Sequence, residues 1–153
     1  MNETLSTTGF PPLLRSAWFS LNQAFRQRLL AQNKNLTPNQ FTVLRWLTEH
    51  PDGSLSQKDM TNLMTSDANT IASLMNRMEK DGLLTRKPHP NDQRCNMLSI
   101  TEKGAQCYQG IIPLAEKLKG EITASLTPEE IAQFEKLLKK IAAASLKAVK
   151  NNS

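Results

Sequence analysis

Two opposite charges, Asp92 and Arg94, stand two residues apart in a polar turn that precedes a short strand pattern. The turn at 89–92 is made of turn-forming residues, and residues 96–100 alternate between the two faces of a strand. A carboxylate at this spacing can orient a guanidinium by a bidentate pair. The pattern therefore predicts an exposed arginine held out at the tip of a β-hairpin.

A second constellation lies on the polar face of a predicted helix at 67–81. Its apolar residues recur at helical spacing, so small and amide side chains fall on the opposite face. Asparagine can pair with the adenine edge in a major groove about 12 Å wide, whereas basic side chains suit phosphates. The predicted contact residues are Asn69, Thr70, Ser73, Asn76, Arg77 and Lys80. An ordinary solvated face explains this pattern alone better, but the adjacent hairpin reverses that preference.

Patterns for catalysis or metal binding are weak. The four soft ligands, His50, His89, Cys95 and Cys107, show no CxxC or HxxxH spacing, and no catalytic triad or glycine-rich phosphate loop is present. The sequence therefore predicts no enzyme, no metal site and no cofactor. Cys95 directly follows Arg94, which leaves a thiol redox switch open, although a plain strand cysteine is the favoured interpretation.

Length and charge set further bounds. The chain has 153 residues, 39% of them hydrophobic, which suits one domain. Its net charge of +5 moderately favours an anionic partner. No apolar run approaches the roughly 18 residues that span a bilayer, and the N-terminus lacks signal-peptide features, so we expect a cytoplasmic protein with reduced thiols.

The elements that must position these residues are mostly helical. Apolar spacing and capping patterns predict helices at about 13–32, 37–50, 56–64, 67–81, 102–122 and 127–150, and short strands at 54–55, 83–87 and 96–100. Two short helices that meet at a tight polar turn are typical of a helix-turn-helix. The fold class predicted is mainly α with a small β-hairpin wing.

This element order resembles the multiple-antibiotic-resistance regulator (MarR) family of winged-helix transcription factors. The matching wing residues are Asp92, Arg94, Leu98, Ile100, Thr101 and Gly104, supported by Leu83, Leu84, Thr85 and Arg86 after Gly82. The resemblance covers nearly all of 1–153 and implies one MarR-like domain, with a DNA-binding lobe at 37–100 and a helical dimerisation region at 10–36 and 101–150. It further implies a homodimer on a pseudo-palindromic operator of double-stranded DNA. The predicted dimerisation residues are Leu14, Leu21, Ile111, Leu118, Phe134, Leu138 and Ile141.

The resemblance also assigns a role to the wing tip. Arg94, with Asp92 beside it, would contact the minor groove, whose negative potential attracts a guanidinium. Ser73 and Ala68 stand where many family members carry charged residues on the recognition helix. Direct base contacts should therefore be sparse, with more dependence on DNA shape.

The resemblance also implies a mode of regulation. Family members are commonly repressors that leave their DNA when a small aromatic or phenolic ligand binds. Arg15, Trp18 and Trp46 are the candidate residues for such an effector, because they offer a cation and aromatic walls. The alternatives are a redox-responsive regulator that uses Cys95 and a helical interaction module without DNA binding.

Overall fold

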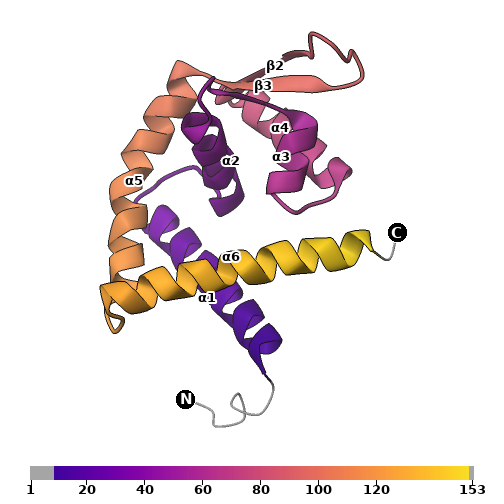
Figure 1. Ribbon diagram of the computed structural model, residues 1–153. Helices are drawn as coiled ribbons and strands as arrows, with labels where there is room; N and C mark the ends of the chain where they lie inside the picture. Colours follow the sequence, from indigo (N-terminus) through magenta and orange to yellow (C-terminus); the bar gives the residue numbers. More distant parts are fainter. Residues whose placement is uncertain (1–8, 152–153) are drawn as a thin grey trace. The chain divides into compact units, whose positions relative to one another are not determined.

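Figure 1 shows the chain as a computed structural model, which describes residues 9–151. The elements, in order, are α1 Phe10–Ala31, α2 Pro38–Glu49, β1 Ser54–Ser56, α3 Gln57–Leu63, α4 Ala68–Lys80, β2 Leu84–Pro88, β3 Asn96–Ile100, α5 Glu102–Ile122 and α6 Pro128–Lys150. The prediction of a mainly helical winged fold is confirmed. The chain divides into two compact units, the first up to residue 115 and the second from residue 116, and each is described by itself.

Local capping chemistry explains where several helices begin. Thr37 accepts the N–H of Gln40 at 3.2 Å, and the Gln40 side chain accepts the N–H of Thr37 at 2.9 Å. Thr127 and Glu130 form the same reciprocal pair at the start of α6. Both predicted capping boxes are therefore present, and each satisfies two N–H groups that a helix start leaves without a partner.

The three strands form one antiparallel sheet in the order β1, β3, β2. The register pairs Leu55 with Leu98, and it places Ser99 between Ser54 and Thr85. Because successive side chains of a strand point to opposite faces, the two leucines share the buried face and the hydroxyl side chains share the other. The sheet thus has one apolar face for the core and one polar face.

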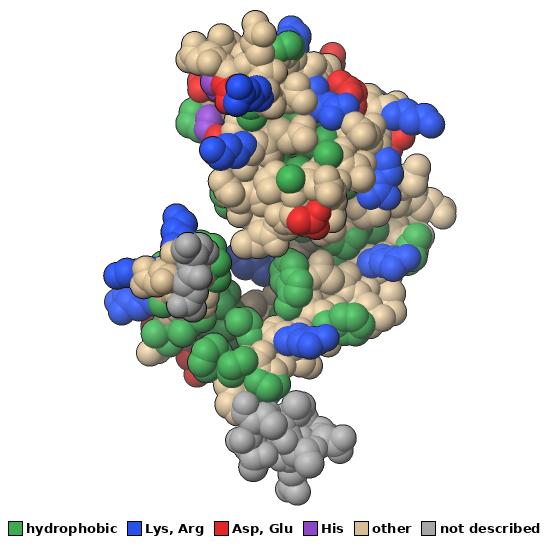
Figure 2. All heavy atoms as spheres, turned by 90° about the vertical axis from the view of Figure 1, so that its right-hand side faces the viewer, with side chains coloured by type: hydrophobic (Ala, Val, Ile, Leu, Met, Phe, Trp, Pro, Cys, Tyr) green, Lys and Arg blue, Asp and Glu red, His purple; other side chains and the backbone are tan. Residues whose placement is uncertain are grey.

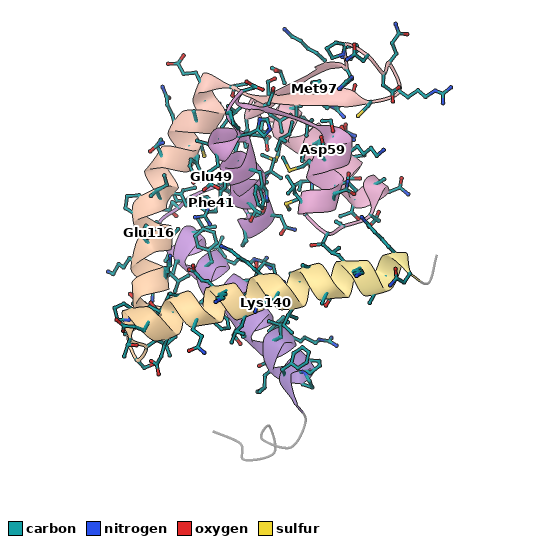
Figure 3. All side chains as sticks on the ribbon, viewed as in Figure 1. Phe41, Glu49, Asp59, Met97, Glu116 and Lys140 are labelled. Carbon is teal, nitrogen blue, oxygen red and sulfur yellow. The ribbon has the colours of Figure 1, made fainter. Side chains whose placement is uncertain are left out.

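The core of the first unit surrounds α2. Val43 and Leu44 are fully buried there. The Phe41 ring, labelled in Figure 3, lies 5.1 Å from that of Phe25 on α1 and 5.2 Å from that of Tyr108 on α5, measured between ring centroids. These contacts join α1, α2 and the first part of α5 in one aromatic cluster.

Two helices carry apolar faces that this single chain leaves exposed. In the second unit, α6 has no buried residue, and Phe134 is 56% exposed. In the first unit, α1 exposes Trp18 and Phe19, each at 63%. None of the helices in residues 9–151 is both long and apolar enough to cross a membrane. Exposed apolar patches of this kind mark contact surfaces.

Candidate nucleic-acid interface

Helices α3 and α4 form the predicted helix-turn-helix. Ser56 caps α3 by accepting the N–H of Asp59 at 3.0 Å, and Asp67 caps α4 by accepting the N–H of Thr70 at 2.9 Å. The Thr70 hydroxyl donates to the second Asp67 oxygen at 2.5 Å. The hydroxyl and then the backbone N–H of Thr70 hold the pKa of Asp67 below its usual range. Because the Thr70 hydroxyl donates its proton to Asp67, it can only accept a hydrogen bond from a DNA group.

The predicted reading face of α4 is exposed along its length. Ile71, Met75 and Met78 are buried on one side of the helix. The exposed residues on the other side are Asn69, Thr70, Ser73, Asn76, Arg77 and Lys80. This division confirms the orientation that the apolar spacing predicted, whereas the contacts of each side chain with DNA stay predictions.

A contact between α4 and β2, missed in the sequence-based prediction, ties the recognition helix to the wing. The Arg86 guanidinium donates to Glu79 Oε2 from Nη2 at 2.7 Å and from Nε at 3.1 Å. The backbone N–H of Arg86 donates to Glu79 Oε1 at 3.2 Å. The side-chain hydrogen bonds from Arg86 are the main reason that the pKa of Glu79 lies below its usual range. Two opposite charges flanking Gly82, seven residues apart, were the signal available in the sequence.

The start of α5 is bound to the loop that follows α4. The Thr101 hydroxyl donates to the Gly82 carbonyl oxygen at 2.6 Å, and the Lys103 ammonium donates to the Asp81 carbonyl oxygen at 2.6 Å. These carbonyls stand at the C-terminal end of α4, where helix carbonyls lack partners within the helix. The first turn of α5 and its cap therefore supply hydrogen-bond donors to carbonyl groups at the C-terminal end of α4.

Gly104 completes this junction by close packing. A Cβ at this position would lie 2.1 Å from the Leu83 carbonyl oxygen, far inside contact distance. The N–H of Gly104 donates to the Thr101 hydroxyl at 3.0 Å, so Thr101 caps α5 as predicted. The glycine of the wing motif is thus needed for space rather than for backbone freedom.

The wing tip exposes Arg94, but Asp92 does not hold it in the predicted way. Asp92 Oδ1 accepts the backbone N–H of Arg94 at 3.0 Å, and within residues 9–151 no ion pair joins the two side chains. The correction has a local cause, since an aspartate in a turn readily binds the backbone two residues further on. The N–H of His89 donates to the Cys95 carbonyl at 2.8 Å and closes the tip. Asp92 therefore shapes the loop and leaves the guanidinium free to point outward.

The cysteines are free thiols in partly buried positions. Cys95 Sγ lies 3.7 Å from the Asn96 carbonyl oxygen, and Cys107 packs against the core. In the part of the chain that the structure describes, no three His, Cys, Asp or Glu residues gather as a metal site would require. A redox role for Cys95 stays a prediction.

The three predicted effector residues differ in their exposure. Arg15 and Trp18 are exposed on α1, whereas Trp46 on α2 packs partly against the core. An open pocket of about 430 Å³ lies between α1 and the start of α2, and its lining is formed by Phe19, Asn22, Gln23, Arg26, Thr37, Pro38 and Asn39. The effector site therefore stays a prediction.

The predicted dimerisation residues fall into two groups. The exposed group consists of Leu14, Leu21, Phe134, Leu138 and Ile141. Ile111 and Leu118 are only 2% and 5% exposed in the single chain. Ile111 belongs to the core of the first unit, so its apolar surface is already covered without a partner.

The chain is similar in sequence to known transcriptional regulators. The model of the MarR family matches residues 36–96. The chain is 32% identical to the uncharacterized HTH-type transcriptional regulator YsmB of Bacillus subtilis over 106 residues, which cover 69% of this chain and 71% of YsmB. It is 30% identical to the homoprotocatechuate degradative operon repressor of Escherichia coli over 116 residues, or 76% of this chain and 77% of the repressor.

Solved structures agree on the fold. AbsC, a MarR family transcriptional regulator from Streptomyces coelicolor, superposes with a TM-score of 0.81 at 21% identity, covering 96% of this chain and 97% of AbsC. A mutant MarR of Escherichia coli complexed with operator DNA superposes with a TM-score of 0.77 at 22% identity, and the match covers 92% of this chain and 99% of that MarR chain. NadR in complex with 4-hydroxyphenylacetate gives 0.75 at 26% identity, with 93% and 96% covered.

Proposed function

The chain belongs to the MarR family of transcriptional regulators, and on that premise we propose that it represses its targets as an operator-bound homodimer that a small aromatic acid releases. Members of this family are DNA-binding regulators rather than enzymes. The observation that carries the operator-binding part is the exposed polar face of α4, which Glu79 and Arg86 connect to a wing whose tip holds Arg94.

The proposed contacts follow from side-chain chemistry. Asn69 and Asn76 would pair with adenine edges in the major groove, while Arg77 and Lys80 would bind phosphates beside it. Arg94 would enter the minor groove, where a planar guanidinium fits best when the groove is narrow. The neutral surface in the middle of α4 would make DNA shape an important part of the specificity.

Dimerisation is supported by the apolar faces of α1 and α6. Leu14 and Leu21 are 39% and 40% exposed on α1, and Leu138 and Ile141 are 37% and 38% exposed on α6. Leaving such faces in water is unfavourable by about 25 cal/mol for each Å² of apolar surface. A second copy of the chain would cover them and would place two winged lobes on the two half-sites of a palindrome.

Two relatives support an aromatic effector. One is named as the repressor of a homoprotocatechuate degradative operon, and NadR was solved with 4-hydroxyphenylacetate, which is a phenolic carboxylate. In this chain Arg15 supplies a cation and Trp18 an exposed aromatic ring on the same helix, three residues apart. By linkage, the effector must bind the conformation that does not bind DNA more tightly than the one that does.

Operator binding is tested by a mobility shift on the DNA upstream of the chain's own gene, with unlabelled unrelated DNA as competitor. We expect the native chain to remain bound to the upstream fragment when the competitor DNA is added. Asn76→Ala should weaken discrimination at an adenine position by about 1–3 kcal/mol. Asn35→Ala, an exposed loop change, serves as the matched control and should leave binding unchanged. Equal competition by unrelated DNA contradicts sequence-specific binding.

Repression and its release are tested separately. A reporter transcribed from the upstream fragment should fall when the chain is present, and 4-hydroxyphenylacetate should raise it again. The same acid should lower operator affinity in solution, and Arg15→Gln should reduce that effect. If the acid changes neither readout, it is not the effector, although operator binding would stand.

A further inference from the structure

Five lysines form a stripe along the C-terminal part of α6. These residues, which we call the lysine stripe, are Lys136, Lys139, Lys140, Lys147 and Lys150. At 3.6 residues per turn they fall within an arc of about 100° and extend over about 21 Å of the helix axis. Figure 2, which views α6 nearly end-on, shows Lys side chains on one side of this helix and hydrophobic side chains on another. Lys140 is labelled on the helix in Figure 3.

The acidic residues of α6 stand before the lysine stripe: they are Glu129, Glu130 and Glu135, and Glu135 precedes Lys139 by four residues. Residues 136–150 contain no Asp or Glu, and within residues 9–151 no ion pair includes any lysine of the stripe. Like charges three or four residues apart destabilise a helix. The helix dipole favours cations only in the last turn, so it accounts for Lys147 and Lys150 but not for the other three. The stripe therefore carries a repulsion that an anionic partner would relieve.

The winged lobe has no net positive charge of its own, so the lysine stripe is a main source of positive charge in the chain. Residues 37–100, which contain the winged lobe, hold seven Lys and Arg against seven Asp and Glu. The lobe is thus formally neutral, although the whole chain has a net charge of +5. Attraction of a protein to duplex DNA in general comes from cations that replace phosphate counterions. A neutral lobe is a weak source of that attraction.

We propose that the lysine stripe of α6 is a second DNA-binding surface, which holds the phosphate backbone of a duplex without reading its sequence. The proposal rests on the proposed function in taking DNA as the polyanion and in covering the apolar face of α6 by a partner copy. With that face covered, the helix cannot insert into a lipid surface, which requires exposed apolar side chains. Duplex DNA carries one charge per about 1.7 Å of its axis, so a stripe of about 21 Å faces enough phosphates for all five ammonium groups.

The test compares full-length dimers that lose equal charge at different places. The stripe variant carries Lys136→Gln, Lys139→Gln and Lys140→Gln. The matched control carries Lys34→Gln, Lys117→Gln and Lys119→Gln, all outside the stripe, and a third variant has arginine at the three stripe positions. Fluorescence anisotropy with a labelled non-operator duplex, over about 50–300 mM KCl, gives the slope of log affinity against log salt for each. Sedimentation confirms that each variant is a dimer.

We expect the slope of the stripe variant to be smaller in magnitude by about 2–3, because each lost phosphate contact removes about 0.9. The control should change it by less than about 1, and the arginine variant should restore it. An unchanged slope in a dimeric stripe variant overturns the proposal, and so does an equal change in the control.

A lipid partner would give a different pattern. If phosphatidylserine vesicles bind the native chain and not the stripe variant, while the DNA slopes are equal, the stripe serves a membrane and the proposal fails. Failure of the proposed function is separate, because it appears as a lack of preference for the operator over the non-operator duplex in the native chain.

Discussion

The Glu79 carboxylate accepts hydrogen bonds from two nitrogens of the Arg86 guanidinium, at 2.7 and 3.1 Å, and so links the last turn of the recognition helix to the first strand of the wing. The pair is partly shielded, with side-chain exposures of 39% for Glu79 and 22% for Arg86. Because the wing tip lies at the end of this strand, the pair helps to set where Arg94 stands relative to α4.

Glu79→Gln should weaken operator binding without any loss of a DNA contact. Glutamine retains the size of the side chain but loses the charge-assisted pair, so we expect about a fivefold rise in Kd, equivalent to about 1 kcal/mol. Glu49→Gln is the matched control, because Glu49 pairs with Arg45 within α2 on an exposed surface. An equal effect of both changes would show that net charge, rather than wing position, is responsible.

Stability should fall in acid because of Glu79 and Asp67. The pKa of each is lowered in the folded chain, for Glu79 by the side-chain hydrogen bonds of Arg86 and for Asp67 by those of Thr70. A lowered pKa means that the stabilisation is complete above the unfolded pKa, which is about 4 for these groups, and is lost as pH falls through the folded value. Urea unfolding between about pH 7 and pH 3 should show this loss, with a shallower dependence in Glu79→Gln.

Gly104→Ala and Gly110→Ala should act in opposite directions on stability, although both lie in α5. The added Cβ at Gly104 would meet the Leu83 carbonyl oxygen at 2.1 Å, whereas nothing lies within 4 Å of one at Gly110. We expect Gly104→Ala to lose at least about 2 kcal/mol of unfolding free energy and Gly110→Ala to gain about 0.5–1 kcal/mol. Equal stability of the two variants in urea would contradict the close packing.

Arg94→Ala should weaken operator binding about tenfold at near-physiological salt and leave the fold intact, because the side chain is exposed and pairs with no carboxylate in residues 9–151. Arg94→Lys keeps the charge but not the planar guanidinium, so its operator affinity should lie between that of the native chain and that of Arg94→Ala. Unchanged affinity of Arg94→Ala in anisotropy titrations would remove Arg94 from the interface.

Peroxide should leave operator binding unaltered. Cys95 is partly buried beside the Asn96 carbonyl, and a reactive thiol needs both access and a stabilised thiolate. Binding titrations of the native chain and of Cys95→Ser, each with and without peroxide, check this. If peroxide released the native chain from the operator but did not release Cys95→Ser, the redox-responsive alternative would be favoured.

Most helix and strand positions were predictable because their causes are local. The Thr37 and Thr127 capping boxes join residues three apart, and the buried set of α4 repeats with the helical period. The start of α1 at Phe10, three residues before the predicted start, was missed because the two prolines that follow occupy its first turn.

The sequence by itself determined the order of the elements, the exposed face of α4 and the exposed arginine at the wing tip, since turn chemistry and periodicity act within a few residues. Only the tertiary structure decided that Glu79 binds Arg86, that Thr101 binds the Gly82 carbonyl and that Asp92 binds backbone rather than a guanidinium. The first two contacts depend on how α4, the sheet and α5 approach one another, and the third depends on the loop's own conformation. Spacing along the chain restricts such geometries, but packing and backbone hydrogen bonding select among them.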